Sequence, residues 1–354
     1  MSVVLGGCSV YRTYKRPDVA VIDSLYRQQI SPADSVASIA DLSWKELFTD
    51  PHLQKLIETG LCNNSDLGIA RLRAEEAEAL LQSARLSYLP SISLSPQGTI
   101  GKVEHSKTTK SYDLATSASW EIDIFGKLTN TKREARVVLE QSEAYRQAVQ
   151  TQVISNIANM YYTLMMLDRQ LEITKSTAEI LKKNAETMEA MKDAAMYNIN
   201  STGVEQSKAA YAQVLASIPD IEQSIRETEN ALSTFLGEAP HAIKRGTLEA
   251  QVLPTELSAG VPIQLLSNRP DVKAAEMALA SCYYNTNSAR AAFYPQITLS
   301  GSAGWTNSAG SAIINPGKLL ASAVGSLTQP LFYRGQNIAR LKAAKAQEES
   351  ANPP

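Results

Sequence analysis

The pattern of apolar residues after Pro90 has a period of two. Apolar side chains recur at every second position in two stretches, 91–101 and 111–125. A period of two predicts β-strands with one apolar and one polar face. Pro96 lies inside the first stretch, which favours a bulge or an edge position for that strand. The pattern therefore predicts two strands joined by a polar loop.

The longest signal in the chain is helical and begins at Lys127. No glycine or proline interrupts 127–196, and a single helix of that length spans roughly 105 Å. Apolar or small residues in it follow 4-3 spacing, which predicts a coiled-coil seam. They are Val153, Ile157, Met160, Leu164, Leu167, Leu171, Thr174, Ala178, Leu181, Ala185 and Met188. Helical pattern resumes at Val204, with a kink or junction expected at Pro219, so 127–236 is predicted to be a helical hairpin.

One segment of the first half returns 205 residues later. Residues 83–95 and 288–300 share a helix that ends in Ala-Arg, aromatic or apolar residues before a proline, and an alternating strand. A second pair of strands is predicted at about 296–306 and 319–332, after a helix at 270–294. Self-similarity of this kind indicates two copies of one structural unit.

The repeat and the breaks between patterns give a domain order. After Gly335 only 19 residues follow, whereas the first copy continues through a long hairpin, so the second copy is expected to be truncated at its C-terminus. The expected order is a signal-peptide remnant (1–7), a tether (8–43), the first repeat (44–236), an equatorial connection (237–262) and the second repeat (263–354).

Composition narrows the class of protein. The net charge of −2 gives no reason to expect a nucleic-acid partner. The longest apolar runs fall far short of the ~20 residues that a membrane helix needs, which excludes a helical membrane protein. A membrane β-barrel remains compatible, because its strands are only ~10 residues of alternating polarity.

The number of strands argues for an oligomer. Four strands cannot close a barrel, and an open edge in lipid leaves backbone groups unpaired. Three chains would supply twelve strands with no edge. The apolar faces would then meet lipid, and the polar faces would line a wet lumen. Aromatic residues suited to an interfacial girdle cluster near the strand ends: Tyr88, Trp120, Phe125, Phe293, Tyr294, Trp305 and Phe332. The alternative, a soluble β-sandwich edge, explains the long helix poorly.

Candidate catalytic groups are scattered. The histidines His52, His105 and His241 show no ligand spacing, so no metal or other cofactor is expected. Glu121 and Asp123 are paired carboxylates on the polar face of a strand, where lumen-facing charge is favoured over an acid–base pair. No Ser–His–acid pattern stands out, and we do not expect an enzyme.

The three cysteines are too few for a disulfide framework. Cys62 and Cys282 lie in helical segments and are expected to be buried small apolar residues. Cys8 follows Leu-Gly-Gly at 5–7, the end of a bacterial lipoprotein signal that is cut short. This pattern predicts a lipidated Cys8, and the alternative is an ordinary N-terminal cysteine.

These features together resemble the TolC/OprM class of outer-membrane factors, specifically the NodT-like lipoprotein branch. The matching segments are spread over nearly the whole chain and occur in the same order as in the family. They are Leu5–Cys8, Tyr14–Pro17, Trp44, Phe48–Pro51, Asn64–Leu67, Trp120–Lys127, Glu229–Leu232 and Arg269–Val272. The fold class implied is an α+β membrane protein, in which long coiled-coil hairpins form a helical barrel. Each chain adds four β-strands to a trimeric twelve-stranded transmembrane β-barrel.

The resemblance also implies partners and sites. It implies a homotrimer anchored in outer-membrane lipid through Cys8, extending into the periplasm and docked to a periplasmic adaptor and an inner-membrane RND-type pump. The adaptor-contact tip would be formed by Asn198, Ile199, Asn200, Ser201, Thr202 and Gly203. Asp193 and Glu205 flank this tip and would form a charged gate ring under threefold symmetry, or else ordinary solvated surface charge.

Four functions remain open from the sequence. The first is a passive exit duct for small molecules, driven by the partner pump. The second is a type I protein-secretion duct with the same architecture. The third is a periplasmic coiled-coil scaffold without a barrel, and the fourth is an inactive remnant of a truncated gene. The lipoprotein signal and the tether motif favour the first.

Overall fold

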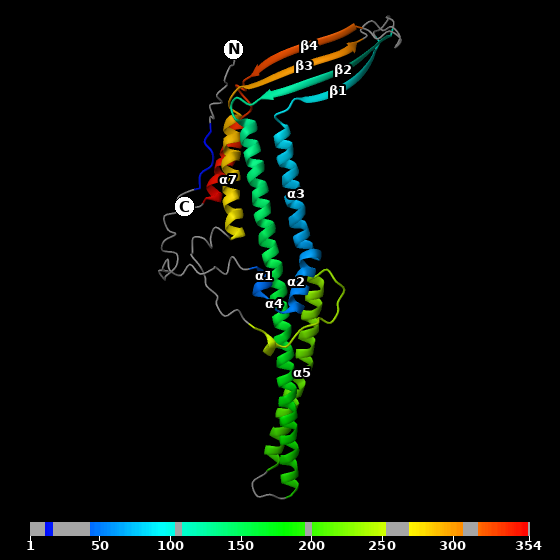
Figure 1. Ribbon diagram of the computed structural model, residues 1–354, viewed down its shortest axis with the longest axis vertical. Helices are drawn as coiled ribbons and strands as arrows, with labels where there is room; N and C mark the ends of the chain where they lie inside the picture. Colours follow the sequence, from blue (N-terminus) through cyan, green and yellow to red (C-terminus); the bar gives the residue numbers. More distant parts are fainter. Residues whose placement is uncertain are drawn as a thin grey trace. The chain divides into compact units, whose positions relative to one another are not determined.

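A computed structural model describes residues 11–16, 43–102, 108–194, 200–252, 269–306 and 318–352 of the chain. These residues form two compact units, whose elements can be followed in Figure 1. The hairpin unit holds 43–71 and 146–252, and the sheet unit holds 11–16, 72–145 and 270–352. Each unit therefore combines segments that lie far apart in the sequence. The expected signal-peptide remnant and Cys8 lie outside the described residues.

The hairpin unit contains two long antiparallel helices (Figure 1). α4 spans Lys127–Asp193 as one helix of 67 residues, and α5 spans Ser201–Phe235. The part of α4 from residue 146 onward belongs to this unit. The uninterrupted helix predicted from Lys127 is confirmed as far as Asp193.

The seam predicted on α4 is its buried stripe. All eleven seam positions from Val153 to Met188 are buried or half-buried. Ile173 and Ile180 lie off the seam and are 53% and 65% exposed. Ala178 and Ala185 are each 5% exposed, and such small residues let two helices approach closely. The 4-3 spacing alone thus identified the packed face.

A kink or a junction was predicted at Pro219, and of these two the junction is absent. α5 runs unbroken through the proline. A proline inside a helix removes one backbone hydrogen bond and crowds the preceding turn. Val204, Ile221 and Leu232 on either side of it are buried, so packing of both halves of α5 keeps them in one helix.

Short elements complete the hairpin unit. They are α1 (Trp44–Leu47), α2 (Pro51–Asn63), the start of α3 (Ser65–Leu86) and the 3-10 helix η4 (Leu248–Ala250). α2 begins as the sequence predicted, because Asp50 accepts a hydrogen bond from the His52 amide and Pro51 occupies the first helical position.

The core of the hairpin unit is a cluster of buried side chains. It is formed mainly by Leu53, Ile57, Leu67, Val153, Ile157, Tyr161, Leu164, Met165, Leu232 and Leu236, with Trp44 and Phe48 packed against it. Burying one aliphatic side chain of this size stabilises a fold by about 1.5–3 kcal/mol. Gly60 lets α2 approach closely, because a Cβ there would collide with the Ile157 side chain.

The sheet unit contains one antiparallel sheet with strand order β1-β2-β3-β4 (Figure 1). The strands are β1 (Ser91–Gly101), β2 (Thr109–Ile122), β3 (Gln296–Thr306) and β4 (Lys318–Thr328). All four predicted strands are present. β2 pairs with β3, so the two copies of the repeat meet in the middle of the sheet.

Two strands end before their predicted limits. The strand expected at 111–125 ends at Ile122, because Asp123 turns to bind the first turn of α4. The strand expected at 319–332 ends at Thr328, where its pairing with Gln296 of β3 is the last in that ladder.

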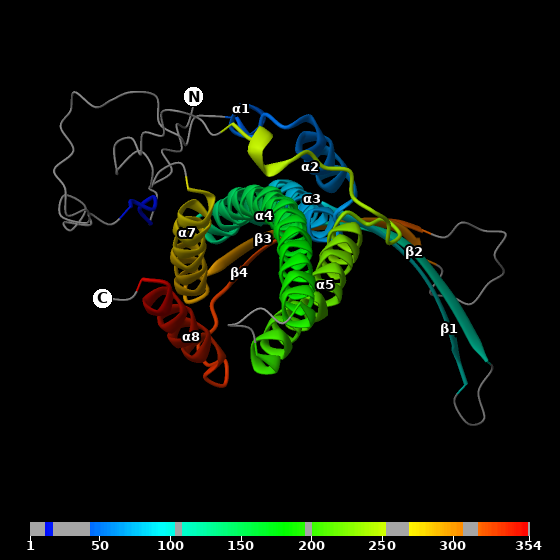
Figure 2. The same ribbon diagram turned by 90° about the horizontal axis from the view of Figure 1, so that it is seen from below.

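Two helices lie side by side below the sheet, as Figures 1 and 2 show. α7 spans Pro270–Ala291 and ends three residues before its predicted limit. α8 spans Gln336–Ala351 and was not predicted. It starts after Gly335, whose φ of 74° is one that residues with side chains rarely adopt. No helix formed by the described residues has the length and apolarity needed to cross a membrane.

Candidate functional site: a two-faced sheet and a charged hairpin tip

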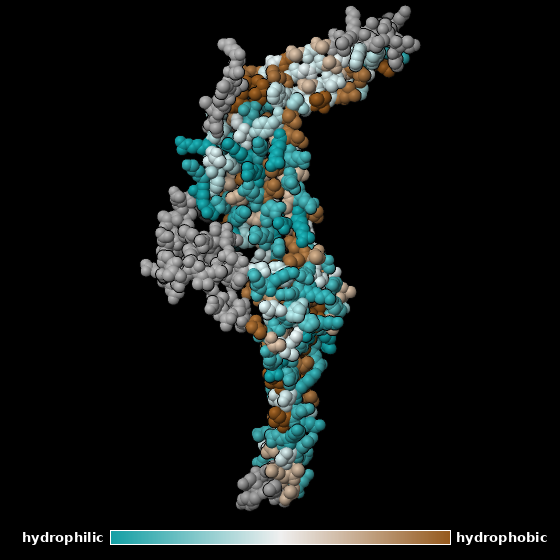
Figure 3. Space-filling model, in the orientation of Figure 1, coloured by the Kyte–Doolittle hydropathy of each residue, from teal (hydrophilic) through white to brown (hydrophobic). Residues whose placement is uncertain are grey.

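One face of the sheet presents exposed apolar side chains. The strand register places alternate residues of all four strands on this face. Its large members, each at least 40% exposed, are Ile92, Leu94, Ile100, Leu114, Trp120, Leu299, Trp305 and Leu327. Hydrophobic residues are visible along the sheet in Figure 3. A contiguous apolar surface of this kind marks a site of contact with lipid or protein.

The opposite face carries rows of hydroxyl groups. Ser93, Ser117, Ser302 and Ser322 pair in one row across all four strands. The Oγ atoms of Ser93 and Ser117 are 2.8 Å apart, as are those of Ser302 and Ser322. Such hydroxyls bond to each other or to water. This face is therefore suited to contact with water, as the alternation predicted.

The two outer strands leave the sheet open. Within the described ranges, β1 and β4 have a ladder neighbour on one side only. Their outer backbone donors and acceptors form an edge that another strand can extend. The sheet as it stands in one chain is thus incomplete on both sides.

The carboxylates Glu121 and Asp123 serve the junction between strand and helix. Asp123 accepts hydrogen bonds from the amides of Leu128 and Thr129, at 3.0 and 2.7 Å. Glu121 forms an ion pair with Lys127 at 2.9 Å. A carboxylate at a helix N-terminus satisfies amides that have no partner within the helix. Both carboxylates are therefore engaged locally, and the lumen-facing position expected for them stays a prediction.

The hairpin tip is the second candidate surface. Asn198 and Ile199 of the predicted tip lie outside the described residues. The side chain of Asn200 accepts a hydrogen bond from the amide of Gly203 at 2.9 Å and caps α5. Residues 201–203 are consequently the first turn of α5 and not a loop, which corrects the predicted helix start at Val204.

A lysine that the sequence analysis missed lies among the acidic residues at the tip. Lys208 donates a hydrogen bond to Glu189 across the hairpin at 2.5 Å and lies 4.0 Å from Glu205. The bond to Glu189 chiefly raises the pKa of Lys208, and Glu205 and Asp193 also raise it. The same bond lowers the pKa of Glu189. The predicted gate residues Asp193 and Glu205 thus share one nearby cation.

A polar network fastens the connection after α5 to the hairpin. Tyr161 donates a hydrogen bond to Asp50 at 2.7 Å, and Gln251 donates to the same oxygen at 2.9 Å. The amide of Gly246 donates to the Tyr161 oxygen at 3.1 Å. Burial raises the pKa of Asp50, but these hydrogen bonds outweigh it and the net pKa is lowered. The network positions the chain and offers no free reactive group.

Arg245 makes a second link of the same kind. It donates two hydrogen bonds to Asp168, at 2.5 and 2.8 Å, and one to Glu229 at 2.6 Å. The bonds to Asp168, and then the bond to Glu229, raise the pKa of Arg245. No residue pattern pointed to this cluster, because its members are far apart in the sequence. Of these three residues, only Glu229 belongs to a segment that carries the family resemblance.

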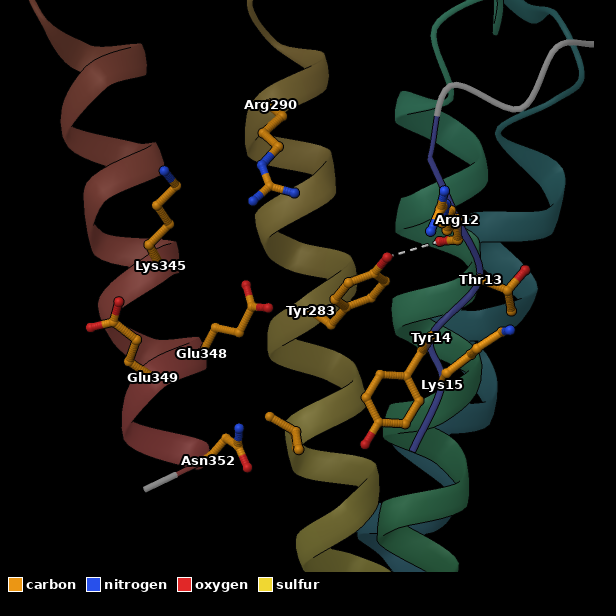
Figure 4. A pocket seen from close by; sticks show the side chains of 11 residues that line it. Arg12, Thr13, Tyr14, Lys15, Tyr283, Arg290, Lys345, Glu348, Glu349 and Asn352 are labelled. Carbon is orange, nitrogen blue, oxygen red and sulfur yellow. Dashed lines mark hydrogen bonds between the residues drawn. The ribbon is translucent and has the colours of Figure 1, made fainter. Parts of the chain in front are cut away.

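A cavity of about 590 Å³ lies in the sheet unit between residues 11–16, α7 and α8 (Figure 4). Tyr283 donates a hydrogen bond to the carbonyl of Arg12 at 3.1 Å, and its ring meets that of Tyr14 edge-on. The charged residues that line the cavity are Arg12, Lys15, Arg290, Lys345, Glu348 and Glu349. With both signs of charge present, this set of residues defines no single ligand chemistry by itself.

The remaining candidates hold no reactive centre. Cys282 is half-buried, but Cys62 is exposed on α2, so the burial expected for Cys62 was wrong. In the part of the chain that the structure describes, no group of three His, Cys, Asp or Glu residues could hold a metal ion.

The chain thus combines a sheet that has one apolar and one hydroxyl face with very long helices. Residues 56–238 and 261–352 match the family model described as outer membrane efflux protein. The chain belongs to this family. Members of the family are channel proteins and not enzymes.

Individual relatives agree with this assignment. The chain is 30% identical over 357 residues to the probable outer membrane lipoprotein SilC of Salmonella typhimurium, covering 98% of this chain and 76% of that protein. It is 30% identical over 365 residues to the toluene efflux pump outer membrane protein TtgC of Pseudomonas putida, covering 98% and 73%. The solved structure of the outer-membrane channel OprN superposes with a TM-score of 0.84 at 27% identity, covering 97% and 78%.

These likenesses establish the general function. The chain is the outer-membrane channel component of a tripartite efflux system, and it extends into the periplasm.

Proposed function

We propose that three copies of this chain close their sheets into one twelve-stranded transmembrane barrel, which serves as a passive exit duct for small molecules. The open four-stranded sheet carries this proposal, because its apolar face is exposed and its outer strands have free edges. Each unpaired backbone group costs several kcal/mol in lipid. Known single-chain barrels need at least about eight strands. Three copies supply twelve and remove every edge.

The two faces of the sheet support the direction of closure. With the apolar face outward, Ile92, Leu94 and Leu327 meet lipid chains, and the serine row lines an aqueous lumen. The α4–α5 hairpin continues the duct into the periplasm, since 67 helical residues extend roughly 100 Å.

The proposal assigns the partners to the hairpin tip. In this proposal residues 198–203 contact a periplasmic adaptor, which connects the duct to an inner-membrane RND-type pump. The name of TtgC, an outer membrane protein of a toluene efflux pump, supports small-molecule substrates. A type I protein-secretion duct would have the same architecture and is the alternative. We assign the chain no catalytic role.

The lipid anchor is placed on Cys8. The Leu-Gly-Gly before it supports this site, as does the description of SilC as a probable lipoprotein. A Cys8→Ser variant is expected to lose incorporation of a labelled palmitate, whereas the matched Cys62→Ser variant keeps it. Equal labelling of the two variants would place the lipid elsewhere.

The charged group at the tip is proposed as part of the gate. Threefold symmetry would bring three copies of Asp193, Glu205 and Lys208 around the end of the duct. Replacing both acids, by Asp193→Asn and Glu205→Gln, is expected to change single-channel conductance in a planar bilayer. The control is Glu179→Gln on an exposed face of α4. Conductance equal to that of the control would remove the gate role.

Membrane extraction and gel mobility test the duct itself. Expressed in a Gram-negative host, the chain is expected in the outer-membrane fraction and to need detergent for extraction. Unboiled, it is expected to migrate at three times the mass of the boiled chain. Release by buffer alone as a monomer would contradict the proposal and favour a periplasmic scaffold.

A further inference from the structure

The cavity of the sheet unit is lined by charged side chains that lack partners. Arg290 donates one hydrogen bond, to Asn287 at 3.0 Å. The side chains of the other five charged lining residues form no hydrogen bond or ion pair with any described residue, and they are Arg12, Lys15, Lys345, Glu348 and Glu349. By contrast, Arg16, the residue after Lys15, forms an ion pair with Glu276. Charged groups that line a cavity without a partner are available to a ligand.

The two signs of charge follow one another along α8. This helix begins beside the end of α7, because Asn337 donates a hydrogen bond to the carbonyl of Ala292 at 3.2 Å. Residues later in α8 therefore lie farther from the sheet. Lys345 comes first, and Glu348 and Glu349 follow three and four residues later, about 4.5–6 Å along the helix axis. The basic group is thus nearer to the sheet than the two carboxylates.

A second cation joins the basic end of the cavity from α7. Arg290 is the residue before the last one of α7. Figure 4 shows the side chains of Arg290 and Lys345 reaching the same level of the cavity from two helices. In the same view Glu348 extends into the space between α8 and α7, farther along α8. The cavity therefore has a cationic end next to the sheet and an anionic group beyond it.

This order of charges suits a molecule in which a phosphate is followed by an ammonium group. Arginine and lysine side chains bind phosphate oxygens through charge-assisted hydrogen bonds. A carboxylate accepts hydrogen bonds from a protonated amine. A phosphate held between Arg290 and Lys345 would direct an ammonium group attached to it toward Glu348. The signs of charge alone define no ligand, but their order indicates phosphoethanolamine.

The position of the cavity favours a lipid as the source of this group. Arg290 lies four residues before Tyr294, whose ring stacks on that of Phe125 at 5.0 Å between the ring centres. Aromatic side chains at the end of a membrane-spanning sheet lie at the level of the lipid headgroups. In the proposed duct the cavity therefore begins next to the headgroups of the periplasmic leaflet. Basic pockets between helices at such a level bind lipid headgroups.

We infer that this cavity binds the headgroup of phosphatidylethanolamine. Arg290 and Lys345 hold the phosphate, and Glu348 accepts hydrogen bonds from the ammonium group. The N-terminal segment forms the opposite wall, where Tyr283 fixes the backbone of Arg12. A bound headgroup would thus connect residues 11–16, α7 and α8. This inference rests on the proposed function, which places the sheet in the membrane.

Lipid titration tests the specificity of the cavity. The protein, delipidated in a non-ionic detergent, is titrated with short-chain phosphatidylethanolamine and with phosphatidylcholine of the same chain length, and isothermal calorimetry measures the affinity. The ammonium group of phosphatidylcholine is fully methylated and has no N–H to donate to Glu348. Phosphatidylethanolamine is expected to bind at least about tenfold more tightly, which corresponds to one charge-assisted hydrogen bond. Equal affinities would overturn the inference.

Two further titrations identify the source of the phosphate. Inorganic phosphate and phosphoethanolamine without acyl chains carry the same charged groups but do not partition into the detergent micelle. Both are expected to bind more weakly than phosphatidylethanolamine, because the acyl chains hold the headgroup at the micelle surface beside the cavity. If either soluble compound binds as tightly as the lipid, the cavity is a site for a free phosphate compound and the lipid assignment is wrong.

Variants assign the two ends of the cavity. Arg290→Gln combined with Lys345→Gln is expected to weaken phosphatidylethanolamine binding at least about tenfold. Lys342→Gln is the control, because Lys342 is exposed on α8 and does not line the cavity. Equal affinities of the double variant and this control would overturn the inference, provided that helical circular dichroism shows both to be folded.

Glu348→Gln gives a result that a general loss of binding would not give. It is expected to remove the preference for phosphatidylethanolamine and to leave the affinity for phosphatidylcholine unchanged. Glu75→Gln on an exposed face of α3 is the control and is expected to keep the preference. A preference that persists in the Glu348 variant would contradict the assigned role of this carboxylate.

The inference and the proposed function can fail separately. If the chain needs detergent for extraction and migrates as a trimer but shows no preference for phosphatidylethanolamine, only the headgroup site is wrong. If the chain is released by buffer as a monomer, the proposed duct is wrong. The lipid is then ruled out as the natural source, whatever the cavity binds in detergent.

Discussion

The hairpin unit and the sheet unit differ in how far they bury their apolar side chains. In the hairpin unit the apolar cluster around Leu53, Ile157 and Leu232 is fully buried within one chain. In the sheet unit comparable residues such as Ile92 and Leu327 are 73% and 67% exposed. Both units follow regular apolar patterns in the sequence. The difference is that the first pattern is buried within the chain, whereas the second stays exposed in one chain. In the proposed assembly, lipid and further copies would cover it.

This difference separates folding from assembly. Substitutions in the hairpin core act on the free energy of unfolding of each chain, because the lost contacts are internal. If the proposed trimer forms, substitutions in the sheet are expected to act mainly on membrane insertion and on the trimer. Four variants test the separation, beginning with the largest effect.

The largest effect is expected from Leu232→Ala in the hairpin core. Leu232 is completely buried, and removing a buried leucine side chain lowers the free energy of unfolding by about 2–5 kcal/mol. Denaturant unfolding of the detergent-solubilised protein, followed by circular dichroism, measures it. The matched control Ile180→Ala, at a 65% exposed position of α4, is expected to change it by less than about 0.5 kcal/mol. Equal effects would refute a core confined to the seam face.

Gly304→Ala should break the sheet and leave the hairpin folded. A Cβ at Gly304 would collide with the carbonyl oxygen of Leu114 and the backbone of Ala115, and overpacking of this kind costs about 1–3 kcal/mol. The unboiled gel is expected to lose its trimer band while helical circular dichroism persists. Gly98→Ala is the control, because a Cβ there meets nothing within 4 Å. A normal trimer in the Gly304 variant would show that β2 and β3 separate without consequence.

Tyr161→Phe removes one bond of the network beside the core. The hydroxyl donates to Asp50 and accepts from Gly246, and its loss is expected to lower the free energy of unfolding by about 1 kcal/mol. Tyr145→Phe, at a 45% exposed position, is the control. If both variants unfold at the same denaturant concentration, the network contributes nothing to stability.

The same variant has a defined pH dependence. Because the pKa of Asp50 is lowered in the fold, its stabilising effect is present above its ordinary pKa of about 4 and is lost as pH falls through the lowered value. Tyr161→Phe is therefore expected to reduce the loss of stability in acid. If the variant loses as much stability in acid as the unchanged protein, the pKa of Asp50 does not depend on this hydrogen bond.

The smallest effect is expected from Glu189→Gln at the tip. Its ion pair with Lys208 lies at the surface, and such pairs are screened by salt. We expect a small loss of thermal stability at low salt and none at high salt. The pair is also expected to weaken in acid, where Glu189 is protonated, and in strong alkali, where Lys208 loses its proton. A salt-independent loss, measured against Glu179→Gln, would indicate a packing defect instead.

Much of the fold was predictable because its patterns are local. The 4-3 spacing from Val153 to Met188 identified the buried face of α4, and alternation identified all four strands. The ends of β1 and β3 were predicted, but the C-terminal ends of β2 and β4 were not, because Ile122 and Thr328 are the last residues with a ladder partner. The sequence also left open whether Pro219 would kink α5 or divide it, and α5 is undivided because packing on both sides outweighs one lost backbone bond.

The candidate site likewise has parts that the sequence predicted and parts that it missed. The apolar and hydroxyl faces of the sheet were evident from alternation. Lys208 at the tip was missed, because its partner Glu189 lies on the other helix of the hairpin. Arg245 was missed for the same reason, since Asp168 and Glu229 reach it from two different helices.

The sequence by itself determined the period of the apolar residues in each segment, the internal repeat and the segments that resemble the family. These features depend only on spacing along one chain. Only the tertiary structure decided which residues lie opposite one another, because register depends on contacts between distant segments. The β2–β3 ladder is the clearest case. It defines ten residue pairs between the two copies of the repeat, whose members lie 175 (Ile122 to Ile297) to 193 (Asp113 to Thr306) positions apart in the sequence and could not be paired from spacing alone.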